Sequence, residues 1–157
     1  MSPSQVTQSV IDNYHNNMPN AFSYTVNTRI ENNTLFIFAS DNGPEFRRPW
    51  RGTAGPWRGT YHTAMEGGLR VPFILRWPGR IAPRAAVTAP ISHLDLFPTI
   101  AQLAGAALPA GVTLDGADVS PLLLGTGPRE AQPIYHYFGY QPQAVRDGKW
   151  KLFLPVD

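Results

Sequence analysis

An aspartate and an asparagine that could bind a metal ion follow the most apolar segment of the sequence. Residues 35–39 read LFIFA, and Asp41 and Asn42 come after a single serine. Carboxylate and amide oxygens are hard ligands that suit Ca²⁺, with Mg²⁺ as the alternative, and do not suit zinc. Two ligands alone do not hold such an ion, so others would have to come from elsewhere. Asp41 could instead form only an Asx-turn before Gly43, and the spacing leaves both interpretations open.

Positive charge follows these two residues within a segment rich in glycine and proline. The arginines that could hold an anion are Arg47, Arg48, Arg51 and Arg58. Residues 43–70 are predicted to form a long loop. A structureless stretch of this length inside a compact domain is uncommon unless it is functional, so we expect this loop to contribute to a site.

Composition limits the possible classes of protein. The chain has 157 residues, of which 43% are hydrophobic and 15% charged, which is enough for one modest domain and argues against disorder. A net charge of +2 without a basic, aromatic-interleaved stripe does not favour nucleic acid as a partner. No apolar run reaches the length of a membrane span, and the N-terminus lacks the features of a signal peptide. The absence of cysteine excludes disulfides and thiol nucleophiles but does not identify a compartment.

Two apolar segments are predicted to form neighbouring core strands. Residues 34–40 form the first strand, and residues 35–39 within it are apolar throughout, which is typical of a strand buried on both faces in the middle of a parallel sheet. Residues 71–77 form the second strand, closed by Pro78-Gly79. Ligands in open α/β sheets bind beyond the carboxyl ends of strands, and this is where Asp41 and Asn42 would lie.

Two helices are predicted from apolar spacing and capping signals. The first is centred on Val6, Val10 and Tyr14, and residues 21–31 after it fit a helix or a strand equally well. The second begins at Leu96 behind a capping Asp95 and ends at Gly105, with Pro98 in its first turn. The side chains expected to face the core are Ile100, Leu103 and Ala104.

The C-terminal residues are predicted to form a small β-sheet. Residues 106–133 are rich in loop formers, and TGP at 126–128 marks a boundary between domains 1–127 and 128–157. Residues 134–138 form a strand, and residues 143–146 and 149–154 flank Asp147-Gly148, a type I′ hairpin signal. The aromatic run HYFGYQ at 136–141 is interpreted as packing within this sheet rather than as a pocket lining.

Five blocks in this order resemble the sulfatase family, and arylsulfatases in particular. They read TLFIFASDNGPE, GTAGPWRGTYHTAMEGGLRVPFILRWPGRI, SHLDLFPTIAQLAGA, LDGADVSPLLLG and AVRDGKWKLF, and together they lie within residues 30–155. The resemblance implies an α/β fold, part of an alkaline-phosphatase-like sandwich with a small C-terminal antiparallel sheet. It also implies a sulfuric ester hydrolase that acts on a sulfate ester. A phosphodiesterase or phosphonate hydrolase of the same superfamily is the first alternative, and a non-catalytic binding or assembly role is the second.

The resemblance implies roles for individual residues. Asp41 and Asn42 match the family's calcium ligands. Tyr61 stands where the family's GKGTTxEGG block has a sulfate-binding lysine, so His62 and Arg58 are the nearby groups that could supply positive charge. Glu66 and Arg70 are expected to form an ion pair. His93 and Asp95 could form a catalytic pair, but capping and packing explain them better, and Asp115 and Asp118 are expected to make turns.

The family's nucleophile has no counterpart in these residues. Sulfatases use a formylglycine made from the Cys or Ser of a C/S-x-P-x-R motif, and the opening MSPSQ has Met1 and Gln5 at the two key positions. Formylglycine, two further metal-binding acids and a catalytic histidine are therefore expected only in an upstream half. We expect the isolated chain to lack activity, to bind calcium weakly, and to self-associate or pair with a complementary N-terminal half.

Overall fold

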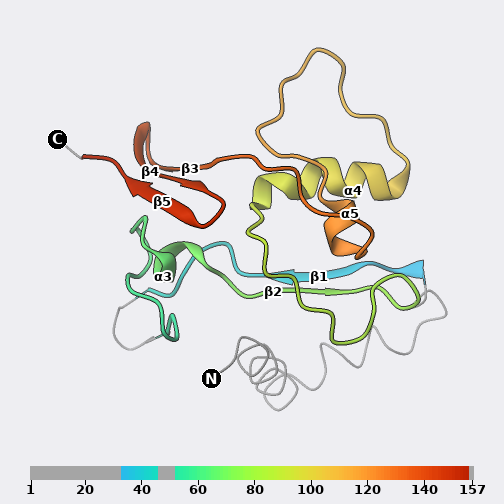
Figure 1. The fold of residues 1–157 in the computed structure, drawn as a ribbon, viewed down its shortest axis with the longest axis horizontal. Coiled ribbons are helices and arrows are strands. Elements are labelled where there is room, and N and C mark those ends of the chain that lie inside the picture. Colours follow the sequence, from blue (N-terminus) through green and yellow to red (C-terminus); the bar gives the residue numbers. More distant parts are fainter. Residues whose placement is uncertain (1–32, 46–51, 156–157) are drawn as a thin grey trace. The chain divides into compact units, whose positions relative to one another are not determined.

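The computed structural model describes residues 33–45 and 52–155 (Figure 1). The helix predicted near the N-terminus and the arginines at 47, 48 and 51 therefore lie outside the described residues. The described chain divides into two compact units. The first contains residues 33–41 and 71–86, and the second contains residues 42–45, 52–70 and 87–155.

A two-stranded antiparallel sheet forms the first unit. Strand β1 (Phe36–Ala39) pairs with β2 (Phe73–Arg76), with Phe36 opposite Arg76 and Ala39 opposite Phe73. The prediction that the two apolar segments are neighbouring strands is confirmed. The prediction of a doubly buried strand within a parallel sheet is wrong for the described residues, because the partner is antiparallel and every residue of both strands is half-buried. A continuous apolar run indicates a strand whose side chains need to be buried on both faces. It does not determine whether the neighbouring strand runs parallel or antiparallel to it.

The chain turns where the sequence predicted it after β2. The backbone N–H groups of Arg80 and Ile81 donate to Trp77 O at 3.1 and 2.9 Å. Gly79 adopts a φ of 75°, a left-handed conformation that a residue without Cβ reaches at little cost.

Two consecutive helical segments begin the longer part of the second unit. A 3₁₀ helix (His93–Asp95) leads directly into α4 (Leu96–Ala104), which ends at Gly105 with a φ of 68°, as predicted. The predicted cap at Asp95 is wrong in detail. Its backbone is already helical, and its carboxylate reaches back to the N–H of Ser92 at 2.8 Å, which completes a capping box with Ser92 as the N-cap.

Helix α4 packs through a different face from the predicted one. Pro98 and Thr99 are buried, Leu103 is half-buried, and Ile100 and Ala104 are exposed. The helix lies against α5 (Ser120–Leu123), a short helix within the segment 106–133 for which the sequence predicts loops. Asp118 forms an Asx-turn before α5, in which its Oδ1 accepts the Ser120 N–H at 2.8 Å, and this confirms its predicted turn role. The buried apolar residues at this contact are Val119 and Leu123.

Three antiparallel strands form the C-terminal sheet, in the order β3-β4-β5 (Figure 1). They are β3 (Ile134–Phe138), β4 (Gln141–Asp147) and β5 (Trp150–Phe153), and Ala144 on the central strand is fully buried. Asp147 pairs with Trp150, so Gly148 and Lys149 are the central turn residues, one position later than predicted. Only Gly148 of these two has a positive φ, which is the pattern of a type II′ turn rather than type I′.

Within the described residues, no helix has the length and apolar character needed to cross a membrane.

Candidate functional site

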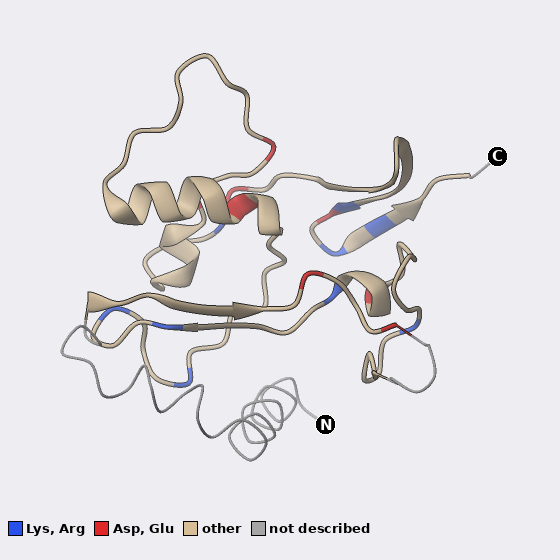
Figure 2. Ribbon diagram, turned by 180° about the vertical axis from the view of Figure 1, so that it is seen from behind, with Lys and Arg blue, Asp and Glu red and all other residues tan. Residues whose placement is uncertain are grey.

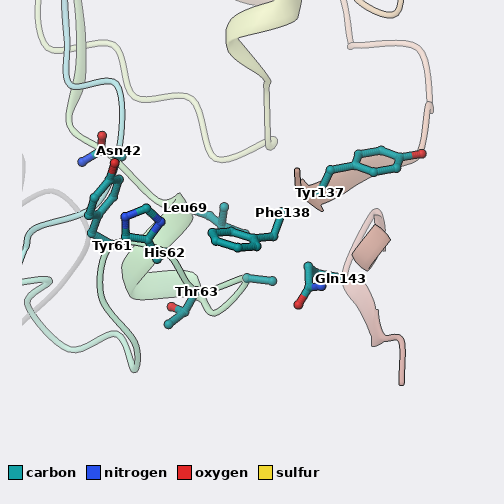
Figure 3. Close-up of a pocket in the computed structure, with 10 residues that line it drawn as sticks. Asn42, Tyr61, His62, Thr63, Leu69, Tyr137, Phe138 and Gln143 are labelled. Atoms are coloured by element: carbon teal, nitrogen blue, oxygen red, sulfur yellow. The ribbon is translucent and has the colours of Figure 1, made fainter. Parts of the chain in front are cut away.

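A pocket of about 200 Å³ in the second unit collects three of the residues that the sequence singled out (Figure 3). Asn42, Tyr61 and His62 line it, together with Thr63, Ala64 and the end of the short helix α3 (Glu66–Leu69) through Gly68 and Leu69. The C-terminal sheet contributes Tyr137, Phe138 and Gln143. The pocket thus joins a loop and a sheet that are far apart in the sequence.

His62 lies between two aromatic rings of the pocket. Its imidazole centroid is 3.7 Å from that of Tyr61, and the Phe138 ring meets it edge-on at 5.6 Å and 77° (Figure 3). The backbone of His62 has a φ of 66°, a left-handed conformation that costs a non-glycine residue about 1–2 kcal/mol. Strain of this kind persists only where the surroundings impose it, and it clusters at functional sites.

Close backbone contacts hold the loop against the residues that follow β1. Gly43 N–H donates to Gly68 O at 2.9 Å, and Tyr61 N–H donates to Pro44 O at 3.0 Å. A Cβ on Gly43 would collide with the Gly67 carbonyl, so only glycine permits this approach. The short separation brings Asn42 and Tyr61 to the same pocket.

The metal-ligand candidates have a donor set that fits a hard cation. Asp41 is exposed, and the Nδ2 group of Asn42 donates to Gly43 O at 2.8 Å, an arrangement that makes Oδ1 the amide atom suited to a cation. Over residues 33–45 and 52–155, no group of three or more His, Asp or Glu side chains converges as a metal site. Further ligands would therefore have to come from outside this part of the chain.

Arg58 lies apart from the pocket lining. Its side chain is exposed, and its backbone carbonyl accepts the Gly67 N–H at 2.7 Å. In the structure Arg58 therefore helps to fold the loop around α3 through its backbone.

Glu66, at the start of α3, is the centre of a charge cluster that the sequence predicted only in part. Its expected ion pair with Arg70 is present at 3.3 Å. The Lys151 Nζ also lies 2.9 Å from Glu66 Oε1, and Arg146 donates to the same oxygen. Figure 2 marks the acidic start of α3 in red and the basic positions on β4 and β5 in blue. Charges on residues this distant in sequence give no local signal, so the sequence could not pair them.

The charges of this cluster change the pKa values of Glu66 and of His136 on β3. Burial acts to raise the pKa of Glu66, but hydrogen bonds from Lys151 and Arg146 and their positive charges outweigh it, so this pKa lies below its ordinary value. Burial lowers the pKa of His136, and the charges of Lys151 and Arg146 lower it further against the opposing effect of Glu66. The His136 Nε2 is buried and has no hydrogen-bond partner within the described residues.

Asp95 has the structural role that the sequence favours over a catalytic pairing with His93. The Asp95 carboxylate is 1% exposed and accepts hydrogen bonds from Ser92 N, Ala117 N and Arg129 at 2.8, 2.9 and 3.3 Å. These bonds use both carboxylate oxygens to join three segments of the second unit. Asp115 lies exposed in a bend, in agreement with its predicted turn role.

The aromatic run HYFGYQ does more than pack the small sheet, so that interpretation is corrected. Tyr137 and Phe138 line the pocket and are 60% and 57% exposed, while Tyr140 is fully exposed.

Comparison with known proteins identifies related chains. The family model described as Sulfatase matches residues 19–106. Arylsulfatase A from Homo sapiens is 51% identical over 125 residues, a match that covers 75% of this chain and 24% of that protein. Steryl-sulfatase from Mus musculus is 41% identical over 132 residues, covering 76% and 21% respectively. The chain thus spans about a quarter of the length of these relatives.

Solved structures support the same assignment. The crystal structure of the PsFucS1 sulfatase from Pseudoalteromonas sp. superposes with a TM-score of 0.71 at 35% sequence identity, covering 78% of this chain and 25% of that one. The neighbours are sulfatases, which confirms the predicted alkaline-phosphatase-like α/β fold with its small antiparallel sheet. More than half of the chain matches the family model, and the chain belongs to the sulfatase family.

Proposed function

We propose that this chain forms part of a sulfuric ester hydrolase and supplies two calcium ligands and part of the sulfate pocket. The observation that carries the proposal is the pocket shared by Asn42, Tyr61 and His62. These residues were selected from the sequence by resemblance, and they line one cavity although a segment of the chain separates Asn42 from the other two. Membership of the sulfatase family supports the type of reaction.

Asp41 and Asn42 would hold the cation through their side-chain oxygens. A bound Ca²⁺ neutralises the negative charge that develops on the sulfuryl oxygens of the ester. The exposed carboxylate of Asp41 provides the anionic ligand, and the amide of Asn42 is oriented by its bond to Gly43. Mg²⁺ is the alternative occupant, because the same oxygen ligands suit both ions.

Tyr61 and His62 would bind the sulfate oxygens in place of the family's lysine. Tyr61 offers one phenolic O–H donor without positive charge, and His62 adds a donor that carries charge when it is protonated. The contacts of the His62 ring with Tyr61 and Phe138 on its two sides hold the ring in one place. We assign Arg58 a secondary role, because its exposed guanidinium would have to move to reach the pocket.

The opposite wall of the pocket would face the alcohol part of the ester. Phe138 presents an aromatic ring and Gln143 an amide, so this side can contact both an apolar surface and a hydroxyl group. Other parts of a sulfatase fold would supply the nucleophile and the remaining ligands, from the same polypeptide or from a partner. They would also cover exposed apolar side chains such as Phe97 and Ile100, which are 54% and 45% exposed.

The test has two parts, the first on the chain alone. Calcium titration calorimetry should show millimolar or weaker binding, because two ligands leave most of the coordination shell to water. Asp41→Ala should abolish this binding, and Asp115→Ala, which removes another exposed carboxylate, should leave it unchanged. Sub-micromolar binding, or hydrolysis of an aryl sulfate by the monomeric chain, would contradict the proposal.

The second part uses a protein in which this chain is joined to the remainder of a sulfatase fold. Asp41→Ala and His62→Ala should each lower the turnover of 4-nitrophenyl sulfate by about a hundredfold or more, as expected when one transition-state contact is removed. Faster turnover of 4-nitrophenyl phosphate than of the sulfate would instead indicate phosphoryl chemistry. Full activity of the Asp41 variant would show that Asp41 is a turn residue.

A further inference from the structure

We infer that Lys151 and Arg146, on the C-terminal hairpin, are positioning residues that hold the pocket loop through Glu66. The inference rests on the proposed function for its catalytic meaning, because the loop carries Tyr61 and His62. Neither basic residue lines the pocket beside these two. Their effect would be transmitted through α3 and the backbone of residues 58–64.

Lys151 makes two contacts with the segment that carries the pocket loop. Its Nζ donates to Glu66 Oε1 at 2.9 Å and also to the backbone carbonyl of Ala64, a residue that lines the pocket. The Lys151 side chain is only 9% exposed. A lysine this buried is stabilised by partners. Its two hydrogen-bond acceptors named above belong to the loop and to α3, while the Phe153 ring on its own strand lies 5.2 Å from the ammonium.

Arg146 completes the attachment from the adjacent strand. It donates to the oxygen of Glu66 that Lys151 also contacts, and its side chain is 18% exposed. Strands β4 and β5 are paired with Arg146 directly opposite Lys151, so a rigid hairpin presents both cations together. Glu66 is therefore fixed from two sides by one element of structure.

Helix α3 then transmits this position to the loop. The Gly67 N–H donates to Arg58 O, and a Cβ at Gly68 would collide with the carbonyls of Thr60 and Thr63. The backbone of residues 58–63 thus lies in direct contact with α3, with no side chain between them to absorb a shift. His62, with its left-handed backbone, is the residue most sensitive to such a shift.

The experiment measures amide hydrogen exchange and the NMR signals of the His62 ring in the 157-residue chain, with no sulfate or calcium present. In Lys151→Met, the amides of Gly43, Tyr61 and Gly67 should lose protection by about tenfold or more, as expected for loss of a charge-assisted hydrogen bond. The Val119 amide, bonded to Thr99, should keep its protection. The His62 ring signals should shift or broaden.

Lys149→Met is the matched control. Lys149 lies on the same hairpin, is exposed, and contacts the Trp150 ring rather than Glu66. It should leave both measurements unchanged. If Lys151→Met does not fold, Arg146→Met and Glu66→Gln weaken the same attachment and should give the same local pattern.

Two results would overturn the inference. An equal loss of protection at Val119 and at the loop amides would show that Lys151 supports only global stability. Unchanged loop amides and His62 signals would show that the loop holds its own position. Because these measurements do not involve sulfate, their outcome is independent of whether the pocket proves to bind a sulfate ester.

Discussion

The Lys151 ammonium lies 2.9 Å from Glu66 Oε1, and the two residues are 85 positions apart in the sequence. The pair joins the segment after the pocket loop to the C-terminal hairpin. Partly buried ion pairs gain attraction from the low dielectric but lose hydration, so their main contribution need not be stability. Here the pair fixes which part of the hairpin meets α3. Replacement of either residue by an uncharged one would leave the other charge in a partly buried place with little water around it.

His136 should titrate at a lower pH than an ordinary histidine, and NMR of its ring protons can measure this. Burial and the charges of Lys151 and Arg146 lower the pKa of His136. In Lys151→Met this pKa should rise, because one of the repelling charges is gone. In Lys149→Met it should stay as in the parent chain. An unchanged pKa of His136 in Lys151→Met would contradict a contribution of the Lys151 charge to the shift.

The lowered pKa of His136 should also make stability depend on pH. His136 binds a proton more readily in the unfolded chain than in the folded chain. The free energy of unfolding should therefore fall as the pH drops from about 6.5, the ordinary pKa of histidine, toward the lower pKa of His136 in the folded chain. His136→Gln should remove this part of the dependence. A second loss should occur at lower pH, below the ordinary pKa of a glutamate, where Glu66 becomes protonated and releases Lys151 and Arg146. Urea unfolding at several pH values would measure both.

Gly68→Ala should destabilise the second unit by about 1–3 kcal/mol, the usual cost of overpacking. The added Cβ would collide with the backbone carbonyls of Thr60 and Thr63, which cannot rotate away. Gly127→Ala is the control, since its Cβ would meet only Pro121 Cβ, at 3.3 Å. Equal stability of the two variants in urea unfolding would show that the loop is free to move away from α3.

Thr99→Val should cost about 1–3 kcal/mol, because it leaves the buried N–H of Val119 without an acceptor. Thr99 Oγ1 accepts this hydrogen bond at 2.9 Å, and Thr99 is 1% exposed. Thr99→Ser keeps the hydroxyl and should cost less, limited to the loss of one methyl group. If the serine variant is the less stable of the two in urea unfolding, packing rather than the hydrogen bond dominates at this position.

Asp95→Asn should destabilise the chain by about 3 kcal/mol or more. The substitution places an NH₂ group among three donors and removes the charge that pairs with the buried Arg129 at 3.3 Å. The exposed Asp115 gives a matched control, for which Asp115→Asn should change stability by less than about 0.5 kcal/mol. Thermal unfolding of the two variants compares them directly, and similar midpoints would contradict a structural role for Asp95.

Local sequence signals predicted several elements correctly. The apolar segments around β1 and β2 became neighbouring strands, Gly105 ended α4, and residues 134–138 formed β3. Each of these depends on properties of a few adjacent residues, such as apolar continuity or the freedom of glycine at positive φ. The resemblance to sulfatases also selected Asn42, Tyr61 and His62, which the structure brings to one pocket.

Tertiary structure alone decided the features that depend on distant residues. The antiparallel direction of β1 and β2, the packing face of α4 and the short helix α5 all follow from which neighbours are present. The hairpin turn moved by one residue because cross-strand pairing of Asp147 with Trp150 set the register. Glu66 could be paired from sequence only with Arg70, four residues further along the chain. Its contacts with Arg146 and Lys151 arise because folding closes a loop of some eighty residues between charges that carry no local signal of one another.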